Sequence, residues 1–304
     1  MPGVHALTLS AAGVQIYPQL EERVAAAARD DDGPTPRSDT AAVPSDGAVV
    51  SARLLRCSFG LPALDELIGG GIPQGTSTVL AGSLGVGKTL LALHFALAGI
   101  AAGERMVYLS LRESRAQLRQ TTAGLTLDAP LLAALAAGTL HFLALLPIKV
   151  EPDILADRLI GVLAEVQPQR LIVDSITEIE DAVSTSPAPA RLREDLAALL
   201  HLLNQQGVTT LFLKEIRQAV AATLDFSAEP LEVLAENVLL AQQVTAQGQL
   251  HRIISVLKLR YSAHDTALRE FTIATPAGIV VQPDQASLFL RHLADEQETQ
   301  RREE

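Results

Sequence analysis

The sequence predicts an α/β fold in which a mostly parallel, twisted sheet is flanked by helices and carries antiparallel hairpins toward the C-terminus. Three observations predict it: an aliphatic composition, an alternation of strand-like and helix-like segments, and a change to strands alone after residue 236. Hydrophobic residues make up 48% of the 304 positions, but aromatic residues only 3%, and Trp is absent. An aliphatic core of this kind suits a helix-covered parallel sheet better than an aromatic-rich sandwich.

The alternating segments begin with a strand at residues 77–81 and a helix from Lys88. Strands are then expected at 106–111, 141–145, 170–174 and 209–213, separated by helices at 115–124, 153–166 and 190–206. This alternation predicts a parallel sheet with crossover helices. The last part of the chain is expected to add antiparallel hairpins, with turns at 246–248 and 276–278 and strands at 237–242, 252–259, 270–274 and 279–282.

Composition divides the chain into four parts. Residues 29–50 hold three prolines, several Asp and little to bury, so they predict a flexible linker. The linker separates a head, residues 1–28, from a main domain, residues 51–284, and a charged, solvated tail follows at 285–304. Within the head, LTLSAAGVQIYP matches FTIATPAGIVVQP near the end of the main domain. The head is either an ordinary hairpin followed by a helix or a duplicated element left from a preceding domain.

Several classes of protein are disfavoured by the composition. The single cysteine, Cys57, cannot form an internal disulfide, and no export signal is recognisable, so a cytoplasmic location is expected. No apolar stretch approaches the roughly 20 residues that span a bilayer, so no membrane association is expected. The net charge of −11 opposes a phosphate backbone and disfavours nucleic acid as a partner.

A phosphate-binding loop is the clearest motif. Residues 82–89, GSLGVGKT, fit G-x-x-x-x-G-K-[ST] between an apolar strand and a long helix. The glycines allow successive N–H groups to point at phosphates, and the helix N-terminus adds partial positive charge. Lys88 supplies a full charge, and Thr89 a hydroxyl for Mg²⁺. We therefore expect ATP to be held by Gly82, Ser83, Leu84, Gly85, Val86, Gly87, Lys88 and Thr89.

An acidic residue completes the predicted nucleotide site. Asp174 ends the apolar strand RLIVD, and the carboxyl ends of parallel strands border the ligand crevice of such sheets. Asp174 is therefore the expected partner of Thr89 at Mg²⁺ and of the bound nucleotide. The alternative is an Asp that merely ends a strand.

Two further segments resemble the KaiC branch of the RecA-like P-loop ATPases. The approach to the P-loop, FGLPALDELIGGGIPQG, is similar to the opening motif of that branch, and VLKLRYSAHD with the following residues 270–273 is similar to its closing motif. The resemblance covers residues 51–283 and implies a RecA-like core in a single KaiC-like domain that uses ATP and Mg²⁺. It also makes the head a candidate remnant of a preceding KaiC domain.

The chain departs from the family where its members carry two adjacent glutamates, the first of which positions the attacking water. Here the segment reads VYLSLRES, so Arg112 replaces the first glutamate and only Glu113 is left as a candidate base. A cation there would hold the terminal phosphate more tightly and slow hydrolysis. Alternatively, Arg112 points to solvent and Glu113 suffices. The chain is thus expected to be an ATPase, with slow turnover, or a non-hydrolysing ATP sensor.

The closing motif of the family supplies cations to the nucleotide of the neighbouring subunit. These correspond to Lys258 and Arg260, which join Lys88 and Glu113 in the expected catalytic set. Their period-two spacing places both on one strand face. Contacts in trans imply a homo-oligomer, which in this family is a hexameric ring. Tyr261 replaces the usual Gly of the motif, and Tyr resists the conformation for which Gly is used.

We expect a regulatory or signalling ring whose nucleotide state changes the surface offered to an unidentified protein partner. The main alternative is a DNA-dependent recombinase or helicase-like motor. In RecA-like proteins the DNA loops correspond to residues 176–190, which hold acidic but no basic residues, and to 215–230, where Arg217 is the only cation. Neither loop could neutralise several phosphates.

Autokinase activity is also disfavoured. The positions that align with the adjacent Ser and Thr phosphorylated in KaiC are Glu232 and Val233, so no hydroxyl is available to accept phosphate.

Overall fold

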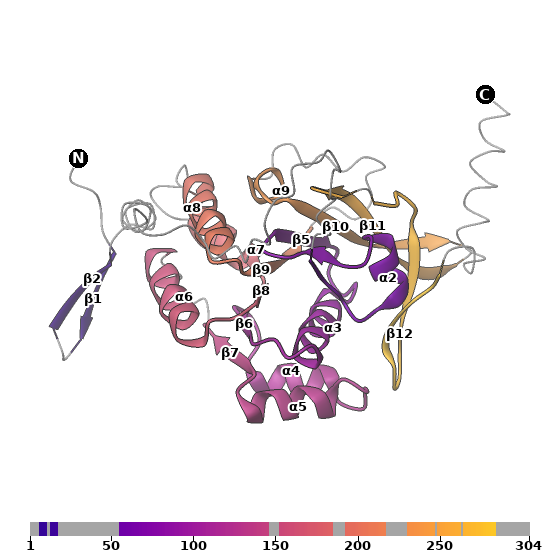
Figure 1. Ribbon diagram of the computed structural model, residues 1–304, viewed down its shortest axis with the longest axis horizontal. Coiled ribbons are helices and arrows are strands. Elements are labelled where there is room, and N and C mark those ends of the chain that lie inside the picture. Colours follow the sequence, from indigo (N-terminus) through magenta and orange to yellow (C-terminus); the bar gives the residue numbers. More distant parts are fainter. Residues whose placement is uncertain are drawn as a thin grey trace, which may run out of the picture.

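The protein is built around one large mixed sheet, shown in a computed structural model (Figure 1). The structure describes residues 6–10, 13–17, 55–145, 152–184, 192–216, 230–246, 248–262 and 264–283. The first strands of the sheet are β5 (Ser77–Gly82), β6 (Met106–Ser110), β7 (Leu140–Ala144), β8 (Arg170–Asp174) and β9 (Thr209–Glu215). The remaining strands are β10 (Asn237–Ala246), β11 (Gln249–Leu259), β12 (Arg269–Ala274) and β13 (Gly278–Val281).

The order of the strands confirms the predicted fold class. Across the sheet it is β13-β12-β11-β10-β5-β9-β8-β6-β7. The pairings from β10 to β7 are parallel, whereas β11, β12 and β13 are added by antiparallel pairing. The four predicted crossover helices are present as α3 (Lys88–Ala101), α4 (Arg115–Thr122), α6 (Pro152–Val166) and α8 (Leu192–Gln205).

Some elements were not predicted. They are α2 (Pro62–Leu67), α5 (Asp128–Ala137), α7 (Ile176–Ser184), α9 (Pro230–Leu234) and the short paired strands β3 (Arg56–Cys57) and β4 (Ile72–Pro73). Helix α5 ends at Gly138, whose φ of +70° is a conformation that glycine adopts without strain, so this end could have been read from the sequence. Helix α7 occupies the first part of the segment expected to be a loop at 176–190, and that expectation was wrong.

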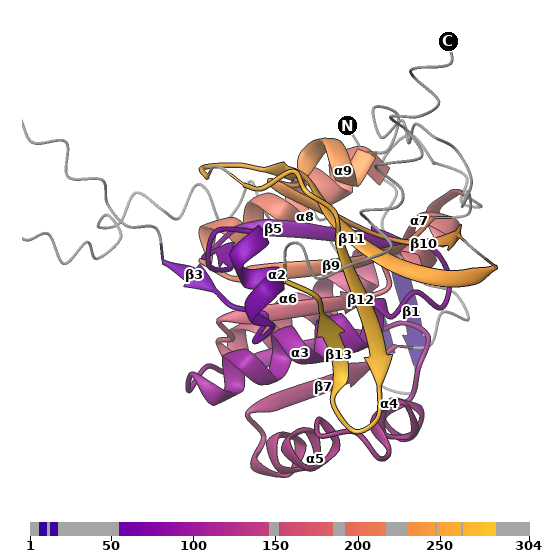
Figure 2. The same cartoon turned by 90° about the vertical axis from the view of Figure 1, so that its right-hand side faces the viewer.

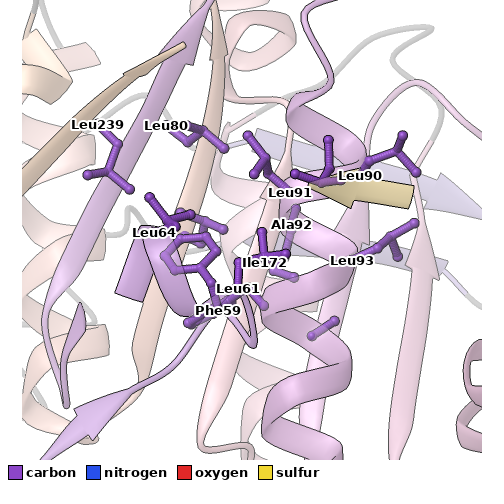
Figure 3. Packing of buried hydrophobic residues seen from close by; sticks show 14 of the residues in the cluster. Phe59, Leu61, Leu64, Leu80, Leu90, Leu91, Ala92, Leu93, Ile172 and Leu239 are labelled. Carbon is purple, nitrogen blue, oxygen red and sulfur yellow. The ribbon is translucent and has the colours of Figure 1, made fainter. Parts of the chain in front are cut away.

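Helices cover both faces of the sheet (Figures 1 and 2). Successive residues of a strand face opposite sides, so in β5 Leu80 packs toward α3 and α2, while Val79 and Ala81 pack toward α6, α7 and α8. Figure 3 shows the first layer, in which Leu91 of α3 and Leu64 of α2 lie among buried side chains of the sheet. Each fully buried aliphatic side chain contributes about 1.5–3 kcal/mol, so the two layers hold the central strands firmly.

The predicted hairpin of the head is confirmed. Strands β1 (Ala6–Ser10) and β2 (Gly13–Tyr17) pair antiparallel, as β12 and β13 do. A common origin of the two hairpins stays a prediction. The expected helix of the head, the linker at 29–50 and the tail at 285–304 lie outside the described residues. In the described ranges, no helix combines the length and apolar character that crossing a membrane requires.

One polar contact joins the helix that follows the P-loop to the last strand. The Nε2 atom of His94, in α3, accepts a hydrogen bond from the backbone N–H of Ile279, in β13, at 3.2 Å. Burial lowers the pKa of His94 below its ordinary value of 6.5. The neutral ring is the form that can accept this hydrogen bond, because a protonated imidazole has donors only.

We expect the free energy of unfolding to decrease as the pH is lowered below about 6.5. The change His94→Gln should make this decrease smaller. The pKa of His94 is lower in the folded chain than in the unfolded one, so between the two values the unfolded chain binds more protons and acid favours it. Gln offers an acceptor to Ile279 but does not titrate. Urea unfolding at pH 7.5 and pH 5.5 measures the effect, and equal pH dependence in both proteins would contradict it.

Candidate nucleotide site

The P-loop joins the end of β5 to the start of α3. Gly85 and Gly87 have φ angles of +71° and +111°, in the left-handed region that favours glycine. At Gly82 the limit is space, because an added Cβ atom would lie 2.4 Å from the carbonyl oxygen of Ala241 in β10. The loop is therefore shaped by its own backbone and by the neighbouring strand.

Lys88 lies over the P-loop. Its Nζ atom donates hydrogen bonds to the carbonyl oxygens of Gly82 and Ser83, each at 2.9 Å. Burial lowers the pKa of Lys88, and the negative charge of Glu215 acts in the opposite direction. The hydroxyl of Ser83 is buried and has no hydrogen-bond partner in the described part of the chain. A partly desolvated ammonium group beside an unpaired hydroxyl fits the oxygens of a polyphosphate.

Asp174 and Thr89 meet, as predicted for a Mg²⁺ site. The buried Oδ2 atom of Asp174 accepts hydrogen bonds from the hydroxyl of Thr89 at 3.0 Å and from that of Tyr108 at 2.6 Å. Burial raises the pKa of Asp174, whereas the hydrogen bonds from Tyr108 and Thr89 lower it. A hydroxyl backed by a carboxylate suits Mg²⁺, which is usually bound through few protein ligands, phosphates and waters. The residues present thus fit Mg²⁺ and ATP.

Tyr108 was missed by the sequence analysis. It lies in the middle of β6, is fully buried and stacks on Phe142, with ring centroids 5.6 Å apart. Burial raises the pKa of Tyr108 well above its ordinary value, and the charge of Asp174 adds to this shift. The available signal was a phenol in an apolar strand, because a buried Tyr hydroxyl requires a partner.

Glu113 follows β6 at the same edge of the sheet. Its backbone N–H donates to the Ser110 hydroxyl at 3.0 Å, and its Oε2 atom is buried with no hydrogen-bond partner in the described ranges. Burial raises the pKa of Glu113, and the charge of Asp174 raises it further. A carboxylate with a raised pKa suits a general base.

Arg112 does not simply point into solvent. Its Nε atom lies 3.2 Å from Oε1 of Glu178, in α7, and its Nη1 atom lies 2.9 Å from Oε2 of Glu215, at the end of β9. The side chain is 48% exposed, so the guanidinium is held at the surface between two carboxylates. Glu178 also accepts a hydrogen bond from the hydroxyl of Ser175 at 2.5 Å. The sequence did not reveal either partner of Arg112.

Lys258 and Arg260 lie at the opposite end of the parallel strands, where β5 and β10 begin. β5 and β10 are parallel, with Thr78 opposite Asn237, and Leu259 of β11 also pairs with Asn237. The P-loop begins four residues beyond Thr78, at Gly82, which is about 13 Å along the strand. The two cations are therefore near the start of β5, while the P-loop follows its end.

The surroundings of these two cations differ. Lys258 donates to the carbonyl oxygens of Val233 and Ala235 at 3.2 and 2.6 Å, and burial lowers its pKa, with the charge of Arg260 as a second cause. The side chain of Arg260 is exposed. Val233 and the neighbouring Glu232 belong to α9.

Asn237 fixes the backbone at this edge. Its Nδ2 atom donates to the hydroxyls of Thr76 and Thr78 at 2.9 and 3.0 Å, and its Oδ1 atom accepts from the N–H of Arg260 at 3.2 Å. The side chain is fully buried. Sequence analysis did not single it out, although a polar residue at the start of an apolar strand was a usable signal.

The comparisons with known proteins agree with this geometry. A family model described as the KaiC ATPase matches residues 57–286. The chain belongs to the KaiC ATPase family. The resemblance to the KaiC branch is thus confirmed, and family membership supports an ATP-binding, RecA-like ATPase domain.

Individual KaiC relatives support the same assignment. The circadian clock oscillator protein KaiC of Thermostichus vulcanus is 27% identical over 219 residues, covering 72% of this chain and 41% of that protein. The circadian clock protein KaiC3 of Synechocystis is 30% identical over 222 residues, covering 72% and 42%. A crystal structure of a KaiC-like protein from Pyrococcus horikoshii matches with a TM-score of 0.65 and 28% identity, covering 76% of this chain and all of that one. The chain spans about two fifths of the curated relatives' length.

Tyr261 adopts the conformation for which the family uses Gly. Its φ angle is +64°, and its side chain is 66% exposed. A left-handed conformation brings the Cβ atom of a non-glycine residue close to the following carbonyl oxygen. The expected conflict at this position is thus present, next to Arg260.

We expect Tyr261→Gly to be more stable than Tyr261→Ala by about 1 kcal/mol. Both changes remove the exposed ring, but only Gly relieves the strain of the left-handed backbone. Urea unfolding of the two variants and the parent measures the difference. An Ala variant as stable as the Gly variant would contradict a strained backbone at this position.

Proposed function

We propose that this chain is a regulatory ATPase that works as a homo-oligomeric ring, binds ATP with Mg²⁺ and turns it over slowly. The observation that carries the proposal is the ion pairing of Arg112 with Glu178 and Glu215, beside Glu113. A cation replaces one of the two carboxylates expected there, so the site keeps the parts that bind nucleotide but has a weakened set of groups for activating water.

Each residue of the site has a role in this proposal. Lys88 would neutralise the outer phosphates, Thr89 would hold Mg²⁺, and Asp174, which accepts the hydrogen bond of the Thr89 hydroxyl, would orient Thr89 for that contact. The bound nucleotide and ion supply an electrophilic phosphoryl group. Glu113 accepts the proton of the attacking water, because its Oε2 atom has no other described partner and its pKa is raised by burial.

The position of Lys258 and Arg260 supports the proposed ring. They lie near the start of β5, whereas the P-loop of the same chain follows its end. A second copy can bring Arg260 to a neighbouring nucleotide, and the exposed side chain of Arg260 is suited to that contact. By analogy with the family we propose six copies, with ATP at each interface and a protein partner that responds to the nucleotide state.

Motor activity on DNA is less well supported. Within α7, Glu178 is paired with Arg112 and Glu180 with Lys214, so this segment offers acidic rather than basic groups. The segment 215–230, which corresponds to the second DNA loop of RecA-like proteins, lies mostly outside the described residues. Acidic groups beside the site repel a phosphate backbone.

A change of Arg112 to Glu is expected to accelerate single-turnover ATP hydrolysis by tenfold or more. The structure shows that this Glu would face Glu178 and Glu215, so the change is best made together with Glu178→Gln to relieve the repulsion. Glu178→Gln alone and Arg112→Gln with Glu178→Gln serve as controls. If the parent chain already hydrolyses ATP as fast as the Glu variant, Glu113 suffices and the proposed slow turnover is wrong.

Arg260→Ala is expected to abolish ATP-dependent assembly, or to reduce ATP turnover by at least tenfold if the ring still forms. Sizing chromatography with and without Mg²⁺ and ATP measures assembly. Arg105→Ala, which removes an Arg from a loop contact with Gln167, is the matched control. A parent chain that stays monomeric with ATP would contradict the ring.

A further inference from the structure

Arg112, Glu178 and Glu215 lie in a row along the carboxyl ends of the parallel strands, and the row leads toward the P-loop. Along this edge the strands run in the order β6, β8, β9 and β5. Arg112 follows β6, Glu178 lies in the helix that follows β8, and Glu215 is the last residue of β9. Glu215 is directly opposite Gly82, the first residue of the P-loop. The guanidinium thus reaches from β6 to the strand next to the P-loop.

The charges of this group act on the phosphate-binding lysine. Burial lowers the pKa of Lys88, the charge of Glu215 raises it and the charge of Arg112 lowers it further, so these groups share one local electrostatic environment. Arg112 is half-exposed and so can change partners, whereas Glu178 and Glu215 are only 16% and 22% exposed, and their release has a desolvation cost that the phosphate contact must offset. A terminal phosphate at this edge would compete with Glu178 and Glu215 for the guanidinium, because Arg binds phosphate and carboxylate in the same geometry.

We propose that Arg112 distinguishes nucleoside triphosphate from diphosphate by exchanging its carboxylate partners for the terminal phosphate. The inference rests on the proposed ATP binding and adds a role for Arg112 in regulation of that site. With a diphosphate, Glu178 and Glu215 hold Arg112. With a triphosphate, the guanidinium moves to the terminal phosphate and releases both carboxylates.

The exchange passes the nucleotide state to α7. Glu178 lies in the first turn of this helix, where its carboxylate also receives the Ser175 hydroxyl. Loss of the ion pair with Arg112 removes one attachment of this turn to the segment after β6. Other attachments of α7 to β9 do not involve Arg112: Glu180 pairs with Lys214 at 3.0 Å, and the backbone N–H of Glu215 donates to the hydroxyl of Thr177 at 2.9 Å. The exchange therefore removes one of the contacts that hold the start of α7.

Nucleotide affinity tests the proposal without measuring turnover. Dissociation constants for the non-hydrolysable analogue AMP-PNP and for ADP, both with Mg²⁺, are measured by calorimetry on the full chain. Arg112→Gln is expected to weaken AMP-PNP about tenfold more than ADP, since a charge-assisted contact to phosphate is lost. Glu178→Gln is expected to strengthen AMP-PNP several-fold and leave ADP unchanged, because Arg112 loses a competing partner.

The ion pair of Glu180 supplies a matched control. Glu180→Gln removes a carboxylate from the same helix and breaks a pair with the same strand, but it does not touch Arg112. We expect it to leave the ratio of the two dissociation constants unchanged. Hydrogen exchange of the amides of α7 gives a second measurement: exchange should be faster with AMP-PNP than with ADP in the parent chain, and equal in Arg112→Gln.

Two results would overturn the exchange of partners. One is a ratio of AMP-PNP to ADP affinity in Arg112→Gln that equals the parent ratio. The other is a weaker affinity of Glu178→Gln for AMP-PNP, which would mean that Glu178 only holds the site together. If Arg112→Gln fails to fold, Glu178→Gln still decides. A parent chain that binds neither nucleotide would overturn the proposed function itself, whereas binding of both with unchanged ratios overturns only this inference.

Discussion

One buried carboxylate holds the nucleotide site together. Asp174, at the end of β8, accepts hydrogen bonds from Thr89 at the start of α3 and from Tyr108 in β6. A buried carboxylate is costly unless it is well bonded, so the two hydrogen bonds offset part of the cost of burying Asp174. The same bonds fix the P-loop helix against the two neighbouring strands. Lys88 is one residue before Thr89, so its position depends on the hydrogen bond between Thr89 and Asp174, which lies outside the P-loop.

β5 connects this site to the cations at the other edge of the sheet. Its last residue, Gly82, begins the P-loop, while near its start Thr78 accepts a hydrogen bond from Asn237, which also accepts one from the backbone of Arg260. All six residues of β5 are buried between two helical layers. Such a strand transmits displacement rather than absorbing it, because packed interiors have low compressibility. The nucleotide site and the backbone that carries Arg260 are thus parts of one rigid unit.

Local patterns in the sequence revealed the P-loop, Asp174 and nearly all strands, because each depends on neighbours in the chain. The partners of Arg112 could not be found in this way, since Glu215 is 103 positions away and no local pattern connects them. Tyr108 and Asn237 were missed for a related reason. The sequence of a buried strand is mostly apolar, and the partner of a polar side chain within it is decided by tertiary packing. Helix α5 was missed because its Ala- and Leu-rich sequence lacks a polar face.

Arg112 is expected to weaken the activation of water at Glu113 in two ways. It occupies a position where the family has a carboxylate, so one acceptor for the attacking water is absent. It also opposes the rise in the pKa of Glu113 that burial and Asp174 cause, and a carboxylate with a lower pKa is a weaker base. Glu178 and Glu215 reduce this second effect while they hold Arg112. Under the proposed function, hydrolysis is therefore slowed both by the loss of the carboxylate that Arg112 replaces and by the positive charge of Arg112.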